Sequence, residues 1–288
     1  MEVSIIIVNY NTRELTSNCI NSIIRETKDL SYEIIVIDNA SNDDSQEYFK
    51  NNHQIKFVEL PENIGFGRAN NVGITHSKGE FLFFLNSDTI LLNNAIKIFH
   101  DFISQNIGKK IGCIGAMLTD EESVVNGYGG RFPNLMLHLK SYVSVFFSKR
   151  GSDFKIEGIS SDVDYVLGAD MFIPREVIND IGGFDAQFFM YFEESDLQLR
   201  MAKKGYSRKI IVGPKIVHLE GKSSFNSIKK LMMVKSSAFK YYKKNRPFIE
   251  YVSFRLFSLL DSCRLFFKKE YRIGDVFTYL KFNFRKTH

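Results

Sequence analysis

Two clusters of polar and acidic residues have types and spacing that could do chemistry. Asn86-Ser87-Asp88 follows an apolar run, and oxygen ligands of this kind can hold a hard divalent cation that bridges phosphates. Glu193 and Glu194 stand together where a helical pattern begins, and a carboxylate there could take a proton from a hydroxyl group. A helix cap or a simple acidic first turn is the alternative for each cluster.

Three other positions extend these clusters. Asp38 ends an apolar run, and its carboxylate could accept the imide N–H of a uracil or thymine ring. Glycines surround Arg68 and Asn70 at a helix entrance, which suits a pyrophosphate, although their spacing is not that of a dinucleotide site. His218 could be a metal ligand, but a lone histidine more often has another role.

Apolar runs alternate with helical patterns along the first half of the chain. Strands and helices in this order form βαβ units and a doubly wound, mostly parallel sheet flanked by helices. The carboxyl ends of such strands share one edge, where α/β sheets bind ligands. Polar stretches at 9–12, 38–45 and 86–89 follow three of the runs, so they should meet at that edge. The runs are 3–8, 33–38, 55–60, 80–85 and 111–118.

The second half of the chain is less regular. Residues 127–162 are irregular, a strand is expected over 165–173, and a helix should begin at 193. Basic amphipathic helices follow from about residue 227. We therefore expect a domain over 1–226 and a helical extension over 227–288.

Charge is divided unevenly between these two parts. Residues 228–288 hold 15 Lys+Arg and 4 Asp+Glu, a net charge of +11. The whole chain is 38 − 33 = +5, which leaves −6 for residues 1–227. A basic extension of this kind favours a polyanionic surface, either lipid headgroups or nucleic acid. The chain carries no known nucleic-acid motif, so we expect a membrane surface and no nucleic acid. The alternatives are a solvated helical face, packing onto the domain, or pairing as a homodimer.

Composition adds few further limits. The chain has 288 residues, of which 44% are hydrophobic and 25% charged, as in ordinary globular proteins. The three cysteines are far apart and odd in number, which favours a reducing cytoplasm over a disulfide framework. Neither a signal peptide nor an uncharged run of about 18 residues is expected.

Seven sequence blocks, in this order, resemble inverting family 2 glycosyltransferases of the GT-A fold, in particular their bacterial rhamnosyltransferase-like branch. The resemblance spans about residues 3 to 225. The blocks are SIIIVNYNT, EIIVIDNASNDDS, NIGFGRANNVGI, FLFFLNSDT, YVLGADMFIPRE, IGGFDAQFFMYFEESDLQLR and IVHLEGKSS.

The resemblance implies roles for individual residues in binding a nucleotide-sugar. Asn86-Ser87-Asp88 stands where the family has Asp-x-Asp, so Asp88 would be the metal carboxylate for Mn²⁺ or Mg²⁺ and His218 a second ligand. Asparagine at the first position departs from the pattern and should weaken metal binding. The remaining donor residues implied are Asn9, Tyr10, Asn11 and Asp38 for the pyrimidine base, and Arg68 and Asn70 near the diphosphate and ribose.

The resemblance also implies the catalytic and acceptor residues. Glu193-Glu194 stands where relatives have Glu-Asp, so Glu194 is the expected base, with Glu193 as the alternative. The acceptor side would carry Gly168, Ala169, Asp170 and Asp196.

The function implied is transfer of a sugar onto a saccharide acceptor in bacterial surface polysaccharide synthesis. The donor would be dTDP-rhamnose or a UDP-hexose, and the acceptor either free or lipid-linked. The protein would be cytoplasmic and peripheral on the inner face of the cell membrane. A nucleotidyltransferase and a non-catalytic sugar-nucleotide-binding protein are the alternatives.

Overall fold

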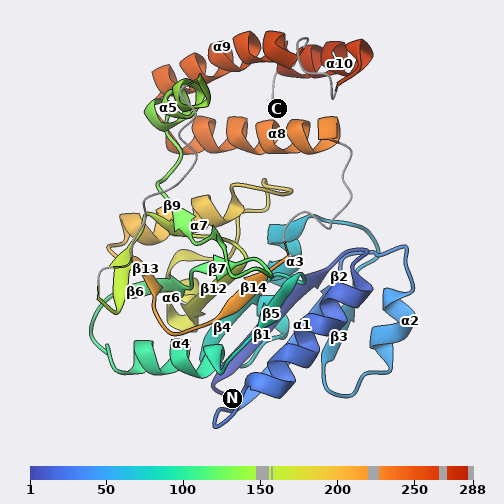
Figure 1. Ribbon diagram of the computed structural model, residues 1–288, viewed down its shortest axis with the longest axis vertical. Coiled ribbons are helices and arrows are strands. Elements are labelled where there is room, and N and C mark those ends of the chain that lie inside the picture. The colour runs from blue at the N-terminus through green and yellow to red at the C-terminus, as the bar shows by residue number, and fades with distance from the viewer. Residues whose placement is uncertain (147–155, 157, 220–226, 266–270, 285–288) are drawn as a thin grey trace.

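The computed structural model describes residues 1–146, 156, 158–219, 227–265 and 271–284. Figure 1 shows a central sheet with helices on both faces and a layer of helices beyond one edge. The α/β architecture expected from the alternating pattern is confirmed.

The central sheet has eight strands, and the first four apolar runs supply four adjacent strands of it. The β1 strand pairs in parallel with β2 and β4, and β2 pairs in parallel with β3. The β12 strand runs antiparallel between β4 and β6. In spatial order the strands are β10 (Ser160–Asp162), β13 (Ser207–Ile211), β6 (Ile111–Gly115), β12 (Asp170–Pro174), β4 (Phe81–Leu85), β1 (Val3–Asn9), β2 (Tyr32–Asp38) and β3 (Lys56–Glu59).

Two strands expected to be continuous are divided. The run 111–118 gives β6 and then β7 (Leu118–Thr119), and the run 165–173 gives β11 (Tyr165–Val166) and then β12. The Asp170 N–H donates to the Leu167 carbonyl oxygen across a short turn, and the Ala116 N–H donates to Asp170 Oδ2 at 2.6 Å. Both breaks therefore fall where the Asp170 side chain bonds to the loop that follows β6.

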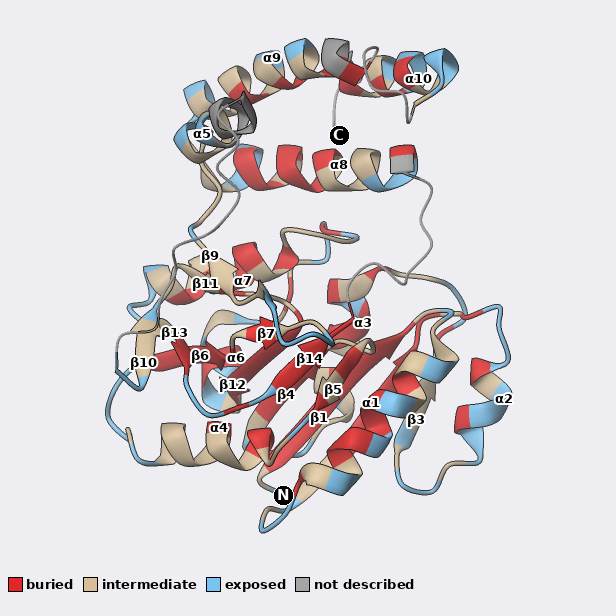
Figure 2. Ribbon diagram, in the orientation of Figure 1, coloured by how far each residue is buried: buried red, intermediate tan, exposed pale blue. Residues whose placement is uncertain are grey.

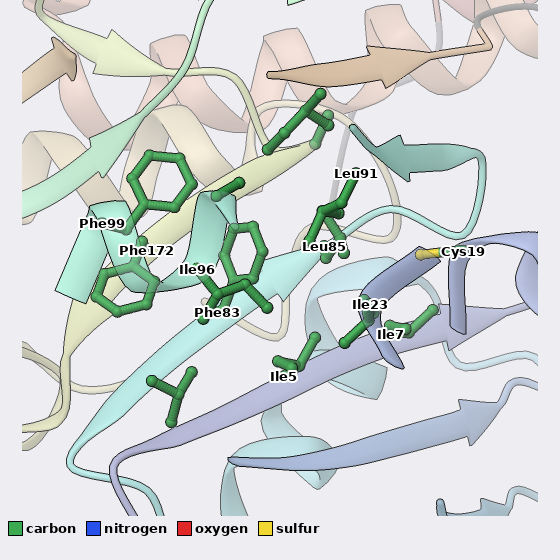
Figure 3. Packing of buried hydrophobic residues seen from close by; sticks show 14 of the residues in the cluster. Ile5, Ile7, Cys19, Ile23, Phe83, Leu85, Leu91, Ile96, Phe99 and Phe172 are labelled. Atoms are coloured by element: carbon green, nitrogen blue, oxygen red, sulfur yellow. The ribbon is translucent and has the colours of Figure 1, made fainter. Parts of the chain in front are cut away.

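Helices cover both faces of this sheet, and the strands between them are mostly buried (Figure 2). Apolar side chains of the helices pack against the sheet on each face. On one face, the rings of Phe83 and Phe99 pack against Phe172 with centroids 5.8 and 5.5 Å away (Figure 3). The helices of that face are α1 (Arg13–Glu26), α2 (Ser45–Lys50) and α4 (Ala95–Ser104), and those of the other are α3 (Phe66–His76), α6 (Arg175–Ile181) and α7 (Glu193–Lys203).

Two small sheets join segments that are distant in sequence. In one, β14 (Ile216–His218) pairs antiparallel with β5 (Thr89–Leu91) and parallel with β7, which also pairs with β8 (Val125–Gly127). In the other, β11 pairs with β9 (Gly129–Gly130). The β5–β14 pairing brings His218 opposite Thr89.

The extension forms helices, as expected, and its first helix packs against the α/β part. The helical layer consists of α8 (Ser227–Asn245), α9 (Phe248–Arg264) and α10 (Ile273–Phe284), with α5 (Leu135–Phe146) beside α9. Phe188 of the α/β part is fully buried among apolar residues of α8 and α9, including Phe239 and Tyr241. Within the described part of the chain, no helix is both long enough and apolar enough to span a bilayer.

The Phe172 ring should contribute strongly to stability, because it is fully buried against three other rings. We expect Phe172→Ala to lower the free energy of unfolding by about 3–5 kcal/mol, measured by urea denaturation. Ile107→Ala is the control, because Ile107 is 88% exposed, and its effect should stay within about 0.5 kcal/mol. Equal effects of both substitutions would contradict the packing described.

Candidate functional site

A buried polar cluster joins the carboxyl ends of β1 and β2. Asn9 lies opposite Asp38 in the sheet register, and its Nδ2 donates to Asp38 Oδ1 at 2.7 Å and to Ser41 Oγ at 3.0 Å. Asn9 Oδ1 accepts from the hydroxyls of Thr12 and Thr16 at 3.0 and 2.7 Å. The polar stretches after these two strands therefore meet at one edge, as the strand pattern predicts.

Asp38 is used entirely within this cluster. Its Oδ1 accepts from Asn9 and from Ser41 Oγ, and its Oδ2 accepts from the Ser41 N–H and from Gln46 Nε2 at 3.0 Å each. A carboxylate has about four lone-pair positions, and Asp38 has no exposed surface. In this arrangement Asp38 orders the surrounding loops and presents no free lone pair to a nucleobase.

A first cavity, of about 150 Å³, lies in front of this cluster. The loops after β1, β2 and β4 form its walls, and Thr12 Oγ1 lies 3.2 Å from Ser87 Oγ where two of these loops meet. Of the predicted donor-binding residues, four line it: Tyr10, Asn86, Ser87 and Asp88. The other lining residues are Val8, Thr12, Leu15, Asn39, Asn63, Gly65, Phe66, Phe189 and Met190.

Asp88 and His218 come together in this region although they are far apart in sequence. Asp88 Oδ1 lies 3.3 Å from His218 Nε2, and the Leu219 N–H donates to the Asp88 carbonyl oxygen at 2.9 Å. The pairing of β14 with β5 thus places an imidazole beside the carboxylate at the end of β4.

A second cavity adjoins the first. The two share Phe66, Asn86 and Met190 in their linings. The other residues that line the second cavity are Leu167, Gly168, Ala169, Tyr191, Glu193, Glu194 and His218. Asp88 therefore lines one cavity and the predicted pair of Glu193 and Glu194 lines the adjoining one, with a common wall between them.

The backbone before α7 has an uncommon conformation. Tyr191 and Phe192 have φ values of 70° and 69°, a left-handed region that bulky residues rarely adopt. Such a conformation costs of order 1–3 kcal/mol for each residue and persists where surrounding contacts impose it. It turns the chain so that Glu193 and Glu194, the first two residues of α7, reach the second cavity.

The two glutamates differ in their environments. Glu193 is 4% exposed and packs beside Gly67 of α3, whereas Glu194 is half-buried beside Gly168. Burial, and then the charge of Glu194, raise the pKa of Glu193 to about 8, although the backbone N–H groups of Tyr191 and Glu193 oppose this. Burial also raises the pKa of Glu194, against the effect of nearby backbone N–H groups.

A carboxyl group with a pKa near 8 is mostly protonated at pH 7. The pKa of Glu193 is raised partly by the charge on Glu194, so the two carboxyl groups titrate as a coupled pair in which two adjacent negative charges are disfavoured. The pair therefore favours a single negative charge at neutral pH, and Glu194 is its more exposed member.

A close backbone contact shapes the wall between the cavities. The Phe66 N–H donates to the Phe189 carbonyl oxygen at 2.8 Å. A Cβ atom at Gly65, where φ is +89°, would lie 2.2 Å from that oxygen. Only glycine permits this approach, which explains one of the glycines near Arg68.

Several predicted site residues fall elsewhere among the described residues. Arg68 Nε donates to the Ala186 carbonyl oxygen at 2.6 Å, and Asn70 Nδ2 donates to the Phe66 carbonyl oxygen at 3.1 Å. Asn11 Oδ1 accepts from the Asn42 N–H. Asp170 is fully buried and does not line the second cavity, and burial raises its pKa. The fully buried Asp196 faces α8, where it bonds to Lys244 and Asn245.

Four other residues that line the first cavity were not predicted individually from the sequence. Asn39 and Asn63 present amides there, and Asn39 Nδ2 donates to Asn63 Oδ1 at 2.9 Å. Phe189 and Met190 contribute apolar surface. All four lie in or next to the sequence blocks quoted above, but amide and apolar side chains give no chemical signal by themselves.

The residues near Asp88 fit a divalent cation. Among the described residues, no cluster of three or more His, Cys, Asp or Glu side chains exists that could hold a metal ion. Cations that act on phosphates, however, commonly take one or two protein ligands and complete their shell with substrate oxygens and water. Two ligands with bonds of about 2.1 Å lie roughly 3 Å apart, close to the 3.3 Å between Asp88 Oδ1 and His218 Nε2.

Comparisons with known proteins show similarity to glycosyltransferases. Residues 4–121 match the family model Glycosyl transferase family 2. The dTDP-rhamnosyl transferase RfbF of Shigella flexneri is 24% identical over 85% of this chain and 78% of its own length. A poly(ribitol-phosphate) beta-glucosyltransferase of Bacillus spizizenii is 32% identical over 37% of this chain. The crystal structure of GalNAc-T7 with UDP, GalNAc and Mn²⁺ matches 98% of this chain and 54% of that chain, with a TM-score of 0.62 and 16% identity.

The matched segment covers 18%, 34% and 58% of the lengths of three curated relatives, so the likeness to them is partial. The structural likeness, at 16% identity, concerns the fold. The family match covers the segment that supplies Asn9, Asp38 and Asp88. Residues 4–121 therefore carry a domain of the glycosyl transferase family 2 type, and the chain has the GT-A fold.

Proposed function

We propose that this protein transfers a sugar from a pyrimidine nucleoside diphosphate to a hydroxyl group of a saccharide acceptor, with inversion at the anomeric carbon. The observation that carries the proposal is the adjoining pair of cavities. Asp88 lines the first, Glu194 lines the second, and Asn86 lies in the wall that they share. A donor in the first cavity would direct its sugar toward the carboxylate in the second.

Glu194 is the proposed catalytic base. It is the more exposed member of the pair, and it lies at the surface of the second cavity, beside Gly168. It would take the proton from the acceptor hydroxyl as that oxygen attacks the anomeric carbon. Glu193, buried and protonated, would keep the pair at a single negative charge.

Asp88 and His218 would hold the divalent cation, with Mn²⁺ favoured over Mg²⁺ because one of the two ligands is an imidazole nitrogen. A bound cation would neutralise charge that grows on the departing diphosphate. Asn86 and Ser87 would add neutral oxygens next to it.

The proposed donors are dTDP-rhamnose and UDP-hexoses. The amides of Asn39 and Asn63 line the first cavity, and an amide can donate to a ring oxygen and accept from an imide N–H. We propose these two residues for contact with the base, with Asp38 ordering the loop that carries Asn39. One relative is named a dTDP-rhamnosyl transferase and one structural neighbour holds UDP, which supports a pyrimidine without choosing between the two.

The proposed setting is synthesis of a bacterial surface polysaccharide at the inner face of the cell membrane. Six large apolar side chains among the described residues of α9 and α10 are more than half exposed, namely Phe248, Ile249, Leu256, Leu260, Ile273 and Phe277. These helices form the side of the helical layer that faces away from the central sheet (Figure 2). Exposed Arg272 and Lys281 lie on α10 or next to it. Apolar side chains with nearby cations suit an anionic lipid surface.

The substitution Glu194→Gln tests whether Glu194 is the catalytic base. It keeps the shape of the side chain but cannot take a proton, so kcat should fall by roughly 10²–10⁴ with donor binding little changed. Because the pKa of Glu194 is raised, kcat of the unaltered protein should fall with decreasing pH at values above the ordinary range of a glutamate. Glu176→Gln, an exposed first-turn acid of α6, is the matched control. A larger loss in Glu193→Gln would assign the base to the other carboxylate.

Donor and cation are tested together by calorimetric titration. UDP and dTDP should bind in the presence of Mn²⁺, and chelation with EDTA should weaken that binding. Asp88→Ala should weaken it equally and remove the effect of EDTA, whereas Glu62→Ala, an exposed carboxylate, should change neither. If GDP binds tightly while UDP and dTDP do not, the proposed pyrimidine nucleobase is wrong. If EDTA does not change the binding of UDP and dTDP, the proposed cation site is wrong.

The membrane surface is tested by co-sedimentation with vesicles. The full chain should bind vesicles that contain phosphatidylglycerol, bind pure phosphatidylcholine weakly, and lose binding at high salt. Replacing Leu256, Leu260 and Phe277 by serine should abolish binding, whereas Ile107→Ser, at an exposed position of the α/β part, should not. A stable dimer that the triple variant converts to a monomer would instead assign this face to a second copy.

A further inference from the structure

The segment 184–192 carries the chain from α6 to the carboxylate pair and is held on two sides. It lines both cavities through Met190 and leads directly into Glu193. On one side, α3 holds it by four hydrogen bonds, one of which runs from the Phe184 N–H to Asn71 Oδ1. The Phe66 N–H donates to the Phe189 carbonyl oxygen, Arg68 Nε to that of Ala186, and Asn71 Nδ2 to that of Phe184.

On the other side, α8 holds the same segment. Ser237, Lys240 and Lys244 are spaced three and four residues apart, which places them on one face of the helix. Ser237 Oγ donates to the Met190 carbonyl oxygen at 2.7 Å, and Lys240 Nζ donates to that of Gln187 at 2.7 Å. Figure 1 shows α8 between α7 and the outer helices.

Lys244 joins the two ends of this region. Its Nζ lies 2.6 Å from Asp185 Oδ2 and 2.7 Å from Asp196 Oδ1. Asp185 precedes the segment's cavity-lining residues, and Asp196 lies in the first turn of α7, two residues after Glu194. Burial acts to raise the pKa of Asp185, but the hydrogen bonds from Lys244 and Gln187 outweigh it and lower that pKa to about 2.

The Asp196 side chain is fully buried, so its carboxylate depends on hydrogen-bond donors from neighbouring residues. Lys244, Asn245 and Arg200 all donate to it. Removing one partner of a buried ion pair leaves the other charge poorly compensated. The first turn of α7 is therefore fixed in part by a residue almost fifty positions further along the chain.

Apolar contacts also hold the segment 184–192 against α8. The ring of Tyr241, also on α8, lies 5.5 Å from that of Phe192, and Phe188 is buried in the same cluster. Phe192 is the second of the two left-handed residues before Glu193. The contacts that impose its conformation thus include α8.

We propose that Lys244 is a positioning residue of the active site, and that α8 sets the orientation of Glu194 toward the acceptor through the segment 184–192. This inference rests on the proposed function, because it assigns a role to the support of the base. Lys244 lines neither cavity within the described residues, so it acts through Asp185 and Asp196 and has no contact with the reacting atoms.

Lys244→Met in the full chain is the test, since methionine keeps an unbranched side chain and removes the charge. A misplacement of catalytic groups by about 1 Å can cost 10²-fold, so kcat should fall by roughly 10- to 100-fold while the KM for the donor changes little. Lys244→Arg should restore most of the rate, because a guanidinium can also bridge two carboxylates. Lys230→Met, at an exposed position of the same helix, should have no effect.

Hydrogen exchange gives a readout that does not need activity. In Lys244→Met, amides of 186–192 should exchange faster while those of β1 and β4 keep their protection. If that variant fails to fold, Ser237→Ala removes only the bond to Met190 and should show the same changes to a smaller degree. Unchanged kcat and unchanged exchange in a folded variant would overturn the inference. If the unaltered protein transfers no sugar, the proposed function is overturned. The hydrogen-exchange result then decides by itself whether Lys244 positions the segment 184–192.

Discussion

A carboxylate with no exposed surface needs a donor for each lone pair, and Asp38 obtains four of them from Asn9, Ser41 and Gln46. A lone pair of the Asp38 carboxylate without a donor would leave part of the desolvation cost of the charged group uncompensated. This requirement fixes the loop after β1 against the loop after β2, and Thr12 extends the network to Ser87 after β4. The first cavity is the space in front of these ordered loops, so its shape depends on a group that does not line it.

Pairings between distant segments then bring in the remaining chemistry. The sheet edge supplies Asp88, but His218 arrives only because β14 pairs with β5. The carboxylate pair arrives because α7 begins after two left-handed residues, which contacts with α3 and α8 hold in place. The pairing of β14 with β5 and the contact with α3 join residues more than a hundred positions apart, and the contact with α8 joins residues almost fifty apart. Each brings a titratable group to the region where the two cavities adjoin.

The sequence predicted the four parallel strands and the shared edge because buried strands and their polar ends have a strong local pattern. It also predicted Asp88, Glu193 and Glu194, whose types carry chemistry. It could not show that the lone pairs of Asp38 are all used, or that Asp196 faces α8, since both depend on partners distant in the chain. The division of 165–173 was missed for a similar reason, because the turn before Asp170 is fixed by its bond to Ala116.

The basic extension shows most clearly why charge counts alone are ambiguous. Lys244 is an interior cation that bridges Asp185 and Asp196, and Lys235 is 6% exposed, bonded to Ser258 of α9. Neither is placed to meet an anionic surface, although both contribute to the excess of positive charge. The inner helix of the layer supports α7, whereas exposed apolar residues lie on α9 and α10. Removing residues 227–288 would uncover Phe188 and release the segment before Glu193, so a loss of activity after truncation could not be assigned to lost attachment. Only substitutions confined to one face can separate the two roles.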